Sequence, residues 1–375
     1  MNNTKNNQVV LPKEQIDSVM TLYASGDFKQ AIEKIKSLNE DYPNVPLLFN
    51  ILGACYKAIG EIQGALQMFE KAVSIKPDYG EVHNNIGIIF LQLNKLDSAV
   101  KSFNRAIESM PNFYGAFYNL GIAFKKLNRL EDAVNSYKKV LSIKPEYPEA
   151  YNNLGTVLKE LGRIEPAIEN YIKATLIKPN YAEAHNNLGV LYKDIGNIDK
   201  AIDNFEKATQ INPNFYEGYC NLGIAQIDKD QISLAIKNLK KSITINSSFS
   251  EAFNNLGVAY MRLGQDDEAI KYYNQALNID SNNAEAHNNF GLVLMGLGQI
   301  NTASEHFIKA LELKPEYIFA LNNFGLLLKQ IGKYKDSLSY YERALAKNPD
   351  FFEAHNNLGN SLKYLKRHDE SLAAY

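Results

Sequence analysis

The stretch of residues 182–215 reads AEAHNNLGVLYKDIGNIDKAIDNFEKATQINPNF, and we number it as positions 1 to 34 of a unit. This stretch decides the fold because its pattern returns along the chain at a constant interval. The glycine of position 8 recurs every 34 residues, ten times without an insertion, at Gly53, Gly87, Gly121, Gly155, Gly189, Gly223, Gly257, Gly291, Gly325 and Gly359. A fixed period of this length indicates an array of like structural units.

Each unit carries two apolar stripes with helical spacing. Positions 3, 4, 7, 10 and 11 are apolar, and positions 17, 20, 21, 24, 27 and 28 form the second stripe. Position 15 between them is glycine in seven units and asparagine or aspartate in three, residues that tolerate the left-handed backbone at a helix end. Proline at position 32 ends the second helix in most units. One such hairpin cannot bury its apolar face alone, so the pattern predicts an all-α solenoid of stacked helix-turn-helix units.

Small residues and one aromatic residue recur at fixed places in the two helices. Position 8 is glycine and position 20 is alanine or serine, while position 24 is aromatic in most units. We expect the small residues to let the two helices approach closely and the aromatic ring to fill the space beside them.

The repeat also divides the chain. Residues 12–351 make ten complete units, residues 1–11 are expected to form a flexible N-terminal tail, and residues 352–375 make a truncated eleventh unit. The last unit stops inside its second helix, which predicts that the chain is a fragment or that its ordered part ends there.

Composition excludes several classes of protein. The 375 residues are 45% hydrophobic and 22% charged, as in soluble folded proteins. The 40 basic against 42 acidic residues argue against a nucleic-acid partner. The sequence contains neither a signal segment nor a run of 18 apolar residues, so it does not predict a membrane protein. Cys55 and Cys220 belong to no metal or redox motif, so a reducing cytoplasm is expected.

Catalytic chemistry is not indicated either. No phosphate-binding loop, nucleophile motif or carboxylate pair interrupts the repeat, so we predict no enzyme activity, no cofactor and no metal. Four histidines fall at position 4, which we expect to be buried: His83, His185, His287 and His355.

The unit resembles the tetratricopeptide repeat. The resemblance rests on Leu-Gly at positions 7 and 8, alanine at 20, an aromatic residue at 24, alanine at 27 and proline at 32, and it covers residues 12–375. It implies a right-handed superhelix whose concave surface is lined by the first helix of each unit, and a general role in protein interaction. The family's clamp for chaperone carboxylate tails needs basic residues at positions 2, 5 and 6. Those places hold glutamate and asparagine here, so that ligand is not expected.

Asparagine dominates the expected concave surface, which comprises positions 2, 5, 6, 9, 12 and 13. Position 5 holds asparagine in eight units. Position 6 holds it in nine consecutive units: Asn85, Asn119, Asn153, Asn187, Asn221, Asn255, Asn289, Asn323 and Asn357. The carboxamides could grip the backbone of an extended peptide, since each both donates and accepts hydrogen bonds. Alternatively, they bond to neighbouring helices and serve the array itself.

Charged and apolar positions add detail to this surface. Position 2 is mostly glutamate and position 12 mostly lysine, including Lys125, Lys159, Lys193 and Lys329. These charges could orient a ligand, or they could complement the helix dipoles. The three units from residue 216 lack the lysine and carry an apolar strip, a candidate anchor site or the result of drift at tolerant positions: Ile224, Ile227, Val258, Met261, Leu292 and Met295.

A narrower resemblance concerns the asparagine row and residues 153–160, NLGTVLKE. Both are similar to the repeat region of the protein O-linked N-acetylglucosamine transferases, which implies a ladder that leads protein substrates to a glycosyltransferase domain. Two functions remain open. The first is a module that binds protein or peptide segments along the concave surface, including the substrate-recognition arm of a larger glycosyltransferase. The second is an assembly scaffold that acts through its outer surface or by self-association.

Overall fold

The computed structural model describes residues 11–375, and within them it contains 22 α-helices and no strand. The helices are α1 (Lys13–Ala24), α2 (Phe28–Asp41), α3 (Pro46–Ala58), α4 (Ile62–Ile75), α5 (Gly80–Gln92), α6 (Leu96–Ser109), α7 (Tyr114–Lys126), α8 (Leu130–Ile143), α9 (Pro148–Glu160), α10 (Ile164–Ile177), α11 (Ala182–Asp194), α12 (Ile198–Ile211), α13 (Tyr216–Asp228), α14 (Ile232–Ile245), α15 (Ser250–Arg262), α16 (Asp266–Ile279), α17 (Ala284–Gly296), α18 (Ile300–Leu313), α19 (Ile318–Gln330), α20 (Tyr334–Lys347), α21 (Phe352–Tyr364) and α22 (His368–Ala374). Odd-numbered helices are the first helices of the units and even-numbered ones the second. The all-α solenoid predicted from the repeat is confirmed.

The expected N-terminal tail lies almost entirely outside the described residues. Its last residue, Leu11, is described and is buried with the side chains of α1 to α3. Leu11 therefore belongs to the packed core of the first unit, whereas the tail was expected to extend through residue 11.

The turn inside each unit has the predicted left-handed backbone. Gly196, between α11 and α12, has a φ of 78°, and the other position 15 glycines have similar values. Asn94, Asn128 and Asp230 take the same conformation, as expected for residues that tolerate it. The eleventh unit places Lys366 there with a φ of 60°, although lysine gains no local hydrogen bond from this conformation.

Glycine at position 8 is explained by the ring at position 24 of the same unit. A Cβ atom built on Gly257 would lie 2.5 Å from the ring of Tyr273, and one on Gly189 would lie 2.7 Å from the ring of Phe205. Both rings are fully buried. The expected close approach of the two helices is confirmed, and even alanine would require the ring to move.

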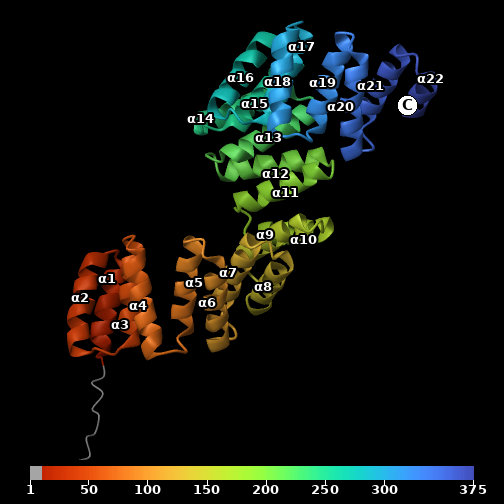
Figure 1. Ribbon diagram of the computed structural model, residues 1–375. Helices are drawn as coiled ribbons and strands as arrows, with labels where there is room; N and C mark the ends of the chain where they lie inside the picture. The colour runs from red at the N-terminus through yellow and green to blue at the C-terminus, as the bar shows by residue number, and fades with distance from the viewer. Residues whose placement is uncertain (1–10) are drawn as a thin grey trace, which may run out of the picture. The chain divides into compact units, whose positions relative to one another are not determined.

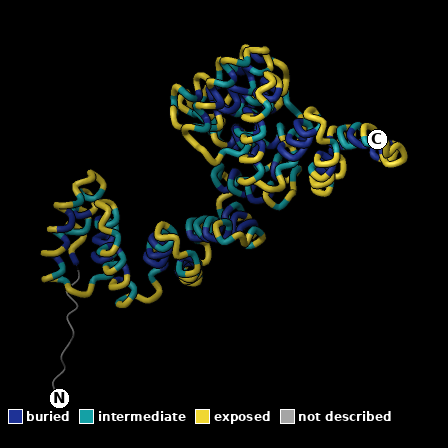
Figure 2. The backbone as a smooth tube through the Cα atoms, turned by 45° about the horizontal axis from the view of Figure 1, so that its top comes forward, coloured by how far each residue is buried: buried dark blue, intermediate teal, exposed yellow. Residues whose placement is uncertain are grey.

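The chain forms two compact bodies, one ending at Pro179 and the other comprising Asn180–Tyr375, which we call the C-terminal body. Each is a stack of helix pairs (Figure 1). Buried residues lie where helices face one another, and exposed residues lie on the outside of the stacks (Figure 2). None of the helices within residues 11–375 has the length and apolar character needed to cross a bilayer.

First and second helices have different neighbours in the C-terminal body. Each first helix from α11 to α19 contacts the first helix of the next unit, whereas the second helices pack extensively only against their neighbours in sequence. The first helices therefore form one layer and the second helices the other. We call the partly exposed face along the first helices the inner surface, and it carries the candidate site.

Candidate functional site

The position 6 asparagines bond to the preceding unit. In the C-terminal body, Asn289 Nδ2 donates to Oδ1 of Asn254, the position 5 residue of the preceding first helix, over 3.1 Å. The same contact joins five other pairs over 3.0 to 3.2 Å: Asn85 with Asn50, Asn119 with Asn84, Asn221 with Asn186, Asn323 with Asn288 and Asn357 with Asn322. This geometry supports the interpretation in which the asparagines serve the array, and it leaves their contact with a ligand as a prediction.

The row changes partner where position 5 is not asparagine. Asn153 Nδ2 donates to the Tyr118 hydroxyl over 3.0 Å. Asn255 follows Cys220 and instead donates to the backbone oxygen of Glu251 in its own helix over 2.8 Å. Asn187 also has an interaction partner. The ladder is thus continuous in residue type but not in its hydrogen bonds.

Positions 5 and 6 differ in exposure, although the sequence placed both on the concave surface. Asn254 and Asn288 at position 5 are only 1% and 3% exposed, because they lie between successive first helices. Position 6 side chains are half-buried, apart from the buried Asn255. A carboxamide carries two hydrogens, and the hydrogen bonds described above for eight position 6 asparagines each use one of them. One feature of the sequence could have distinguished position 5 from position 6. Position 5 has Tyr118 and Cys220 in place of asparagine in two units, and these residue types are more often found in protein interiors than asparagine is.

The predicted groove lysines have mixed environments. Lys125 Nζ in α7 lies 3.1 Å from Oε1 of Glu160 at the end of α9, the first helix of the next unit. Lys329 Nζ donates to Asn357 Oδ1 over 3.2 Å, and burial lowers the pKa of this lysine. Lys159 and Lys193 are half-buried. The lysines are therefore partly engaged by the repeat itself.

The predicted apolar strip comes together in the C-terminal body, where all six side chains join one hydrophobic cluster. Ile227 and Met295 are buried in that cluster, at 4% and 8% exposure. The other four are half-buried and leave part of their surface open: Ile224, Val258, Met261 and Leu292. These four therefore have more surface open to a ligand than Ile227 and Met295.

Three of the position 4 histidines contact the loops that lead into the first helices: His83, His287 and His355. His83 Nε2 lies 2.7 Å from the Pro77 oxygen, and His355 Nε2 lies 2.8 Å from the Pro349 oxygen. A carbonyl oxygen only accepts, so Nε2 carries the hydrogen in these contacts. His83 and His185 are buried as expected, whereas His287 and His355 are half-buried.

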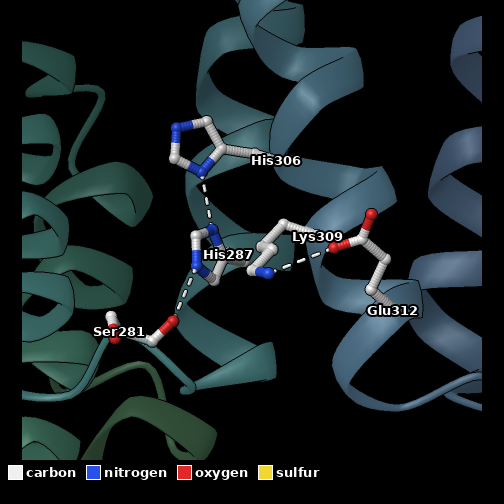
Figure 3. A network of polar contacts seen from close by, with 5 residues as sticks. All are labelled: Ser281, His287, His306, Lys309 and Glu312. Atoms are coloured by element: carbon white, nitrogen blue, oxygen red, sulfur yellow. Dashed lines mark hydrogen bonds and ion pairs between the residues drawn. The ribbon is translucent and has the colours of Figure 1, made fainter.

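His287 has a second histidine as its neighbour. Its Nε2 lies 3.2 Å from the Ser281 oxygen, and its Nδ1 lies 2.9 Å from Nδ1 of His306 in α18 (Figure 3). Nε2–H of His287 therefore faces the carbonyl, and Nδ1 accepts a hydrogen from His306. Burial, together with the neighbouring His287, lowers the pKa of His306 to about 4.

One glutamate of position 2, Glu285, bonds to the asparagine row, a role that the sequence did not reveal. Asn254 Nδ2 donates to Glu285 Oε1 over 3.1 Å, which links position 5 of one unit to position 2 of the next. The sequence pattern alone offered the helix dipole or a ligand as reasons for glutamate. The contact with a neighbouring unit adds a third.

Comparison with family models identifies the repeat. Models described as tetratricopeptide repeat match residues 48–79, 182–215, 216–249, 282–348 and 322–375, and one described as TPR repeat matches residues 123–162, 155–196 and 259–298. A model described as Est1 DNA/RNA binding domain matches residues 65–139, which overlap the helical repeats α4 to α8.

Solved structures with the same fold include yeast Tom70, with a TM-score of 0.52 and 15% identity over 96% of this chain and 90% of that one. The Cut9–Hcn1 hetero-tetramer of the APC/C has a TM-score of 0.54 and 14% identity, covering 92% of this chain and 89% of that one. MamA is 28% identical over 47% of this chain and 96% of its own, with a TM-score of 0.42. The sequence matches none of the curated proteins with which it was compared. The repeat models and the fold agree, and the chain belongs to the tetratricopeptide repeat family.

Proposed function

We propose that the inner surface binds extended segments of other proteins. The observation that carries this proposal is the row of position 6 carboxamides along the first helices, which are half-buried except at Asn255. A carboxamide has two hydrogens, so one that donates to the array keeps a second hydrogen for a ligand. Packed helices lie about 8 to 10 Å apart, and an extended segment rises about 3.3 Å per residue. One carboxamide could therefore serve roughly three residues of a ligand, whatever their side chains.

The test places a photo-crosslinking amino acid at one inner and one outer site of the C-terminal body. Val258 in α15 is half-buried on the inner surface, and Leu234 in α14 is 49% exposed on a second helix. Neither change removes an asparagine, so the array stays intact. In a lysate of the source cells, we expect light-dependent products from the Val258 variant and few from the Leu234 variant.

The opposite pattern would move the function to the outer surface. Products from Leu234 alone, or products that are dimers of this chain, would favour the assembly scaffold and reject the inner surface as a binding site.

Within this proposal, the segments are substrates presented to a glycosyltransferase. This role is supported by the asparagine row and by residues 153–160, which are similar to the repeat region of the protein O-linked N-acetylglucosamine transferases. Mass spectrometry of the proteins crosslinked at Val258 is expected to find O-linked N-acetylhexosamine. Crosslinked proteins without that modification would reject this role while retaining the binding function.

A further inference from the structure

The inner surface along α13, α15 and α17 has a different charge from its flanks. Position 12 is lysine in the units on either side, at Lys193 and Lys329. In these three units it is Ile227, Met261 or Met295, while position 2 keeps glutamate at Glu217, Glu251 and Glu285. Position 13, which also belongs to the inner surface, is Asp228 in α13 and Arg262 in α15. At positions 2, 12 and 13, these three units therefore carry four carboxylates and one guanidinium.

Glu251 differs from its neighbour Glu285 in what lies beside it. Glu285 receives a hydrogen bond from the position 5 carboxamide of the preceding unit, Asn254. The corresponding residue beside Glu251 is Cys220, a buried thiol whose pKa is raised mainly by burial and further by the carboxylate of Glu251. Among residues 11–375, no side chain donates a hydrogen bond or forms an ion pair with the Glu251 carboxylate.

The charge of Glu251 is therefore incompletely compensated. Glu251 is exposed at the surface, yet partial desolvation by the neighbouring protein, together with the nearby Glu285 carboxylate, raises its pKa. Lys193 offsets the effect only in part. An incoming cation would relieve the repulsion between the two carboxylates.

Apolar surface lies within reach of the same carboxylate. Glu251 and Val258 are seven residues apart on α15, a rise of about 10 Å, which an extended segment spans in about three residues. Met261 adds a flexible thioether that adapts to different apolar side chains. Acidic and apolar contacts therefore occur together on one inner surface, at a spacing that suits a short segment.

We propose that α13, α15 and α17 bind a protein segment in which lysine or arginine stands about three residues from an apolar residue. The cation lies between Glu251 and Glu285, and the apolar side chain lies on Ile224, Val258, Met261 and Leu292. This inference rests on the proposed binding function of the inner surface and names the chemistry of its ligand.

The test measures the fluorescence anisotropy of three labelled decapeptides with the full chain. The probe GLSSRLSSRG has the expected spacing, a second peptide replaces both arginines with glutamate, and a third replaces both leucines with serine. We expect the probe to bind at least ten-fold more tightly than either relative. Raising the salt concentration should weaken the binding of the probe, because opposite charges meet at the surface.

Two variants locate the contact. The double substitution Glu251→Gln, Glu285→Gln keeps the side-chain shape and removes a like-charge pair, so we expect a folded protein and a loss of probe affinity of at least ten-fold. Glu353→Gln changes the same position 2 in α21 and serves as the matched control, with no expected change in affinity. Circular dichroism checks that all variants are folded.

Each contrary result overturns the inference in a recognisable way. No binding of the probe, or tighter binding of the glutamate peptide, contradicts the assigned chemistry. Undiminished binding by the double variant contradicts the assigned location. In each case, crosslinking at Val258 still tests the inner surface separately, so a failure of this inference is distinguishable from a failure of the proposed function.

Discussion

At the scale of single residues, close contact between glycine and an aromatic ring sets the distance between the two helices of a unit. In α17, a Cβ atom on Gly291 would lie 2.9 Å from the ring of Phe307, whereas one on Gly296 would have no neighbour within 4 Å. The same helix therefore contains a glycine required by packing and one that packing does not require.

We predict opposite effects for alanine at these two glycines. Gly291→Ala should lower the free energy of unfolding by about 1 to 3 kcal/mol, because the buried ring must shift. Gly296→Ala should leave it unchanged or raise it by up to about 1 kcal/mol through helix propensity. Thermal and urea denaturation followed by circular dichroism would measure both. Equal effects would show that helix propensity, rather than the ring, explains the repeated glycine.

The histidine pair predicts a dependence of stability on pH. The folded protein lowers the pKa of His306 from the ordinary 6.5 to about 4, so folding favours its neutral form. The stabilising contribution is therefore complete above pH 6.5 and is lost as the pH falls toward 4. It amounts to about 1 to 2 kcal/mol after allowance for solvent screening.

His306→Asn is the matched variant for this prediction. In α11 and α12, the equivalent pair already consists of His185 and Asn204, whose Nδ1 and Oδ1 atoms lie 3.2 Å apart. We expect the variant to fold normally and to lose less stability than the unaltered chain between pH 6.5 and 4. Identical pH curves for the two proteins would assign the acid sensitivity to other groups.

At the scale of helices, hydrogen bonds between asparagines join successive first helices. Asn289 donates to Asn254, which is almost completely buried, whereas Asn255 donates to its own helix backbone. Only the first of these bonds links two units. The two asparagines should therefore contribute differently to stability although they occupy the same position 6.

We predict that Asn289→Ala costs about 1 to 3 kcal/mol, since it leaves a buried carboxamide oxygen of Asn254 without its donor. Asn255→Ala should cost less than about 1 kcal/mol, because alanine favours the helix and the preceding unit loses only a weak contact with the Cys220 thiol. Chemical denaturation measures both values. A larger loss at Asn255 would contradict the importance of the bonds between units.

The sequence predicted the helices better than it predicted the surface between them. Period, turn residues and the glycine–aromatic pairing followed from spacing, because each depends on contacts inside one unit. The roles of positions 5 and 6 did not follow, because a helical wheel describes one helix and Asn254 is buried by the next unit. The contact of Asn254 with Glu285 likewise depends on how two units stack.

At the scale of the whole molecule, stability is distributed among neighbouring units. Each helix packs mainly on helices near it in sequence, so distant units share few contacts. Solenoids of this kind behave as a chain of locally coupled elements.

We therefore predict a local response to Gly291→Ala in hydrogen exchange. Amides of α17 to α19 should exchange faster than in the unaltered chain, whereas those of α1 to α4 should be unchanged, because local opening needs only the nearest interfaces to break. Mass spectrometry of peptides after exchange resolves these segments. A uniform increase over residues 11–375 would indicate that the chain unfolds as one cooperative unit.

The hydrogen bonds between units have one more consequence. In the C-terminal body, Asn221, Asn289, Asn323 and Asn357 all donate toward the N-terminal neighbour. The row of hydrogen bonds is therefore polar: every donor lies in the C-terminal unit of its pair and every acceptor in the N-terminal unit. A peptide bound along this row would meet donors and acceptors in a different order if its direction were reversed. We therefore expect a peptide and its reversed sequence to bind with different affinities.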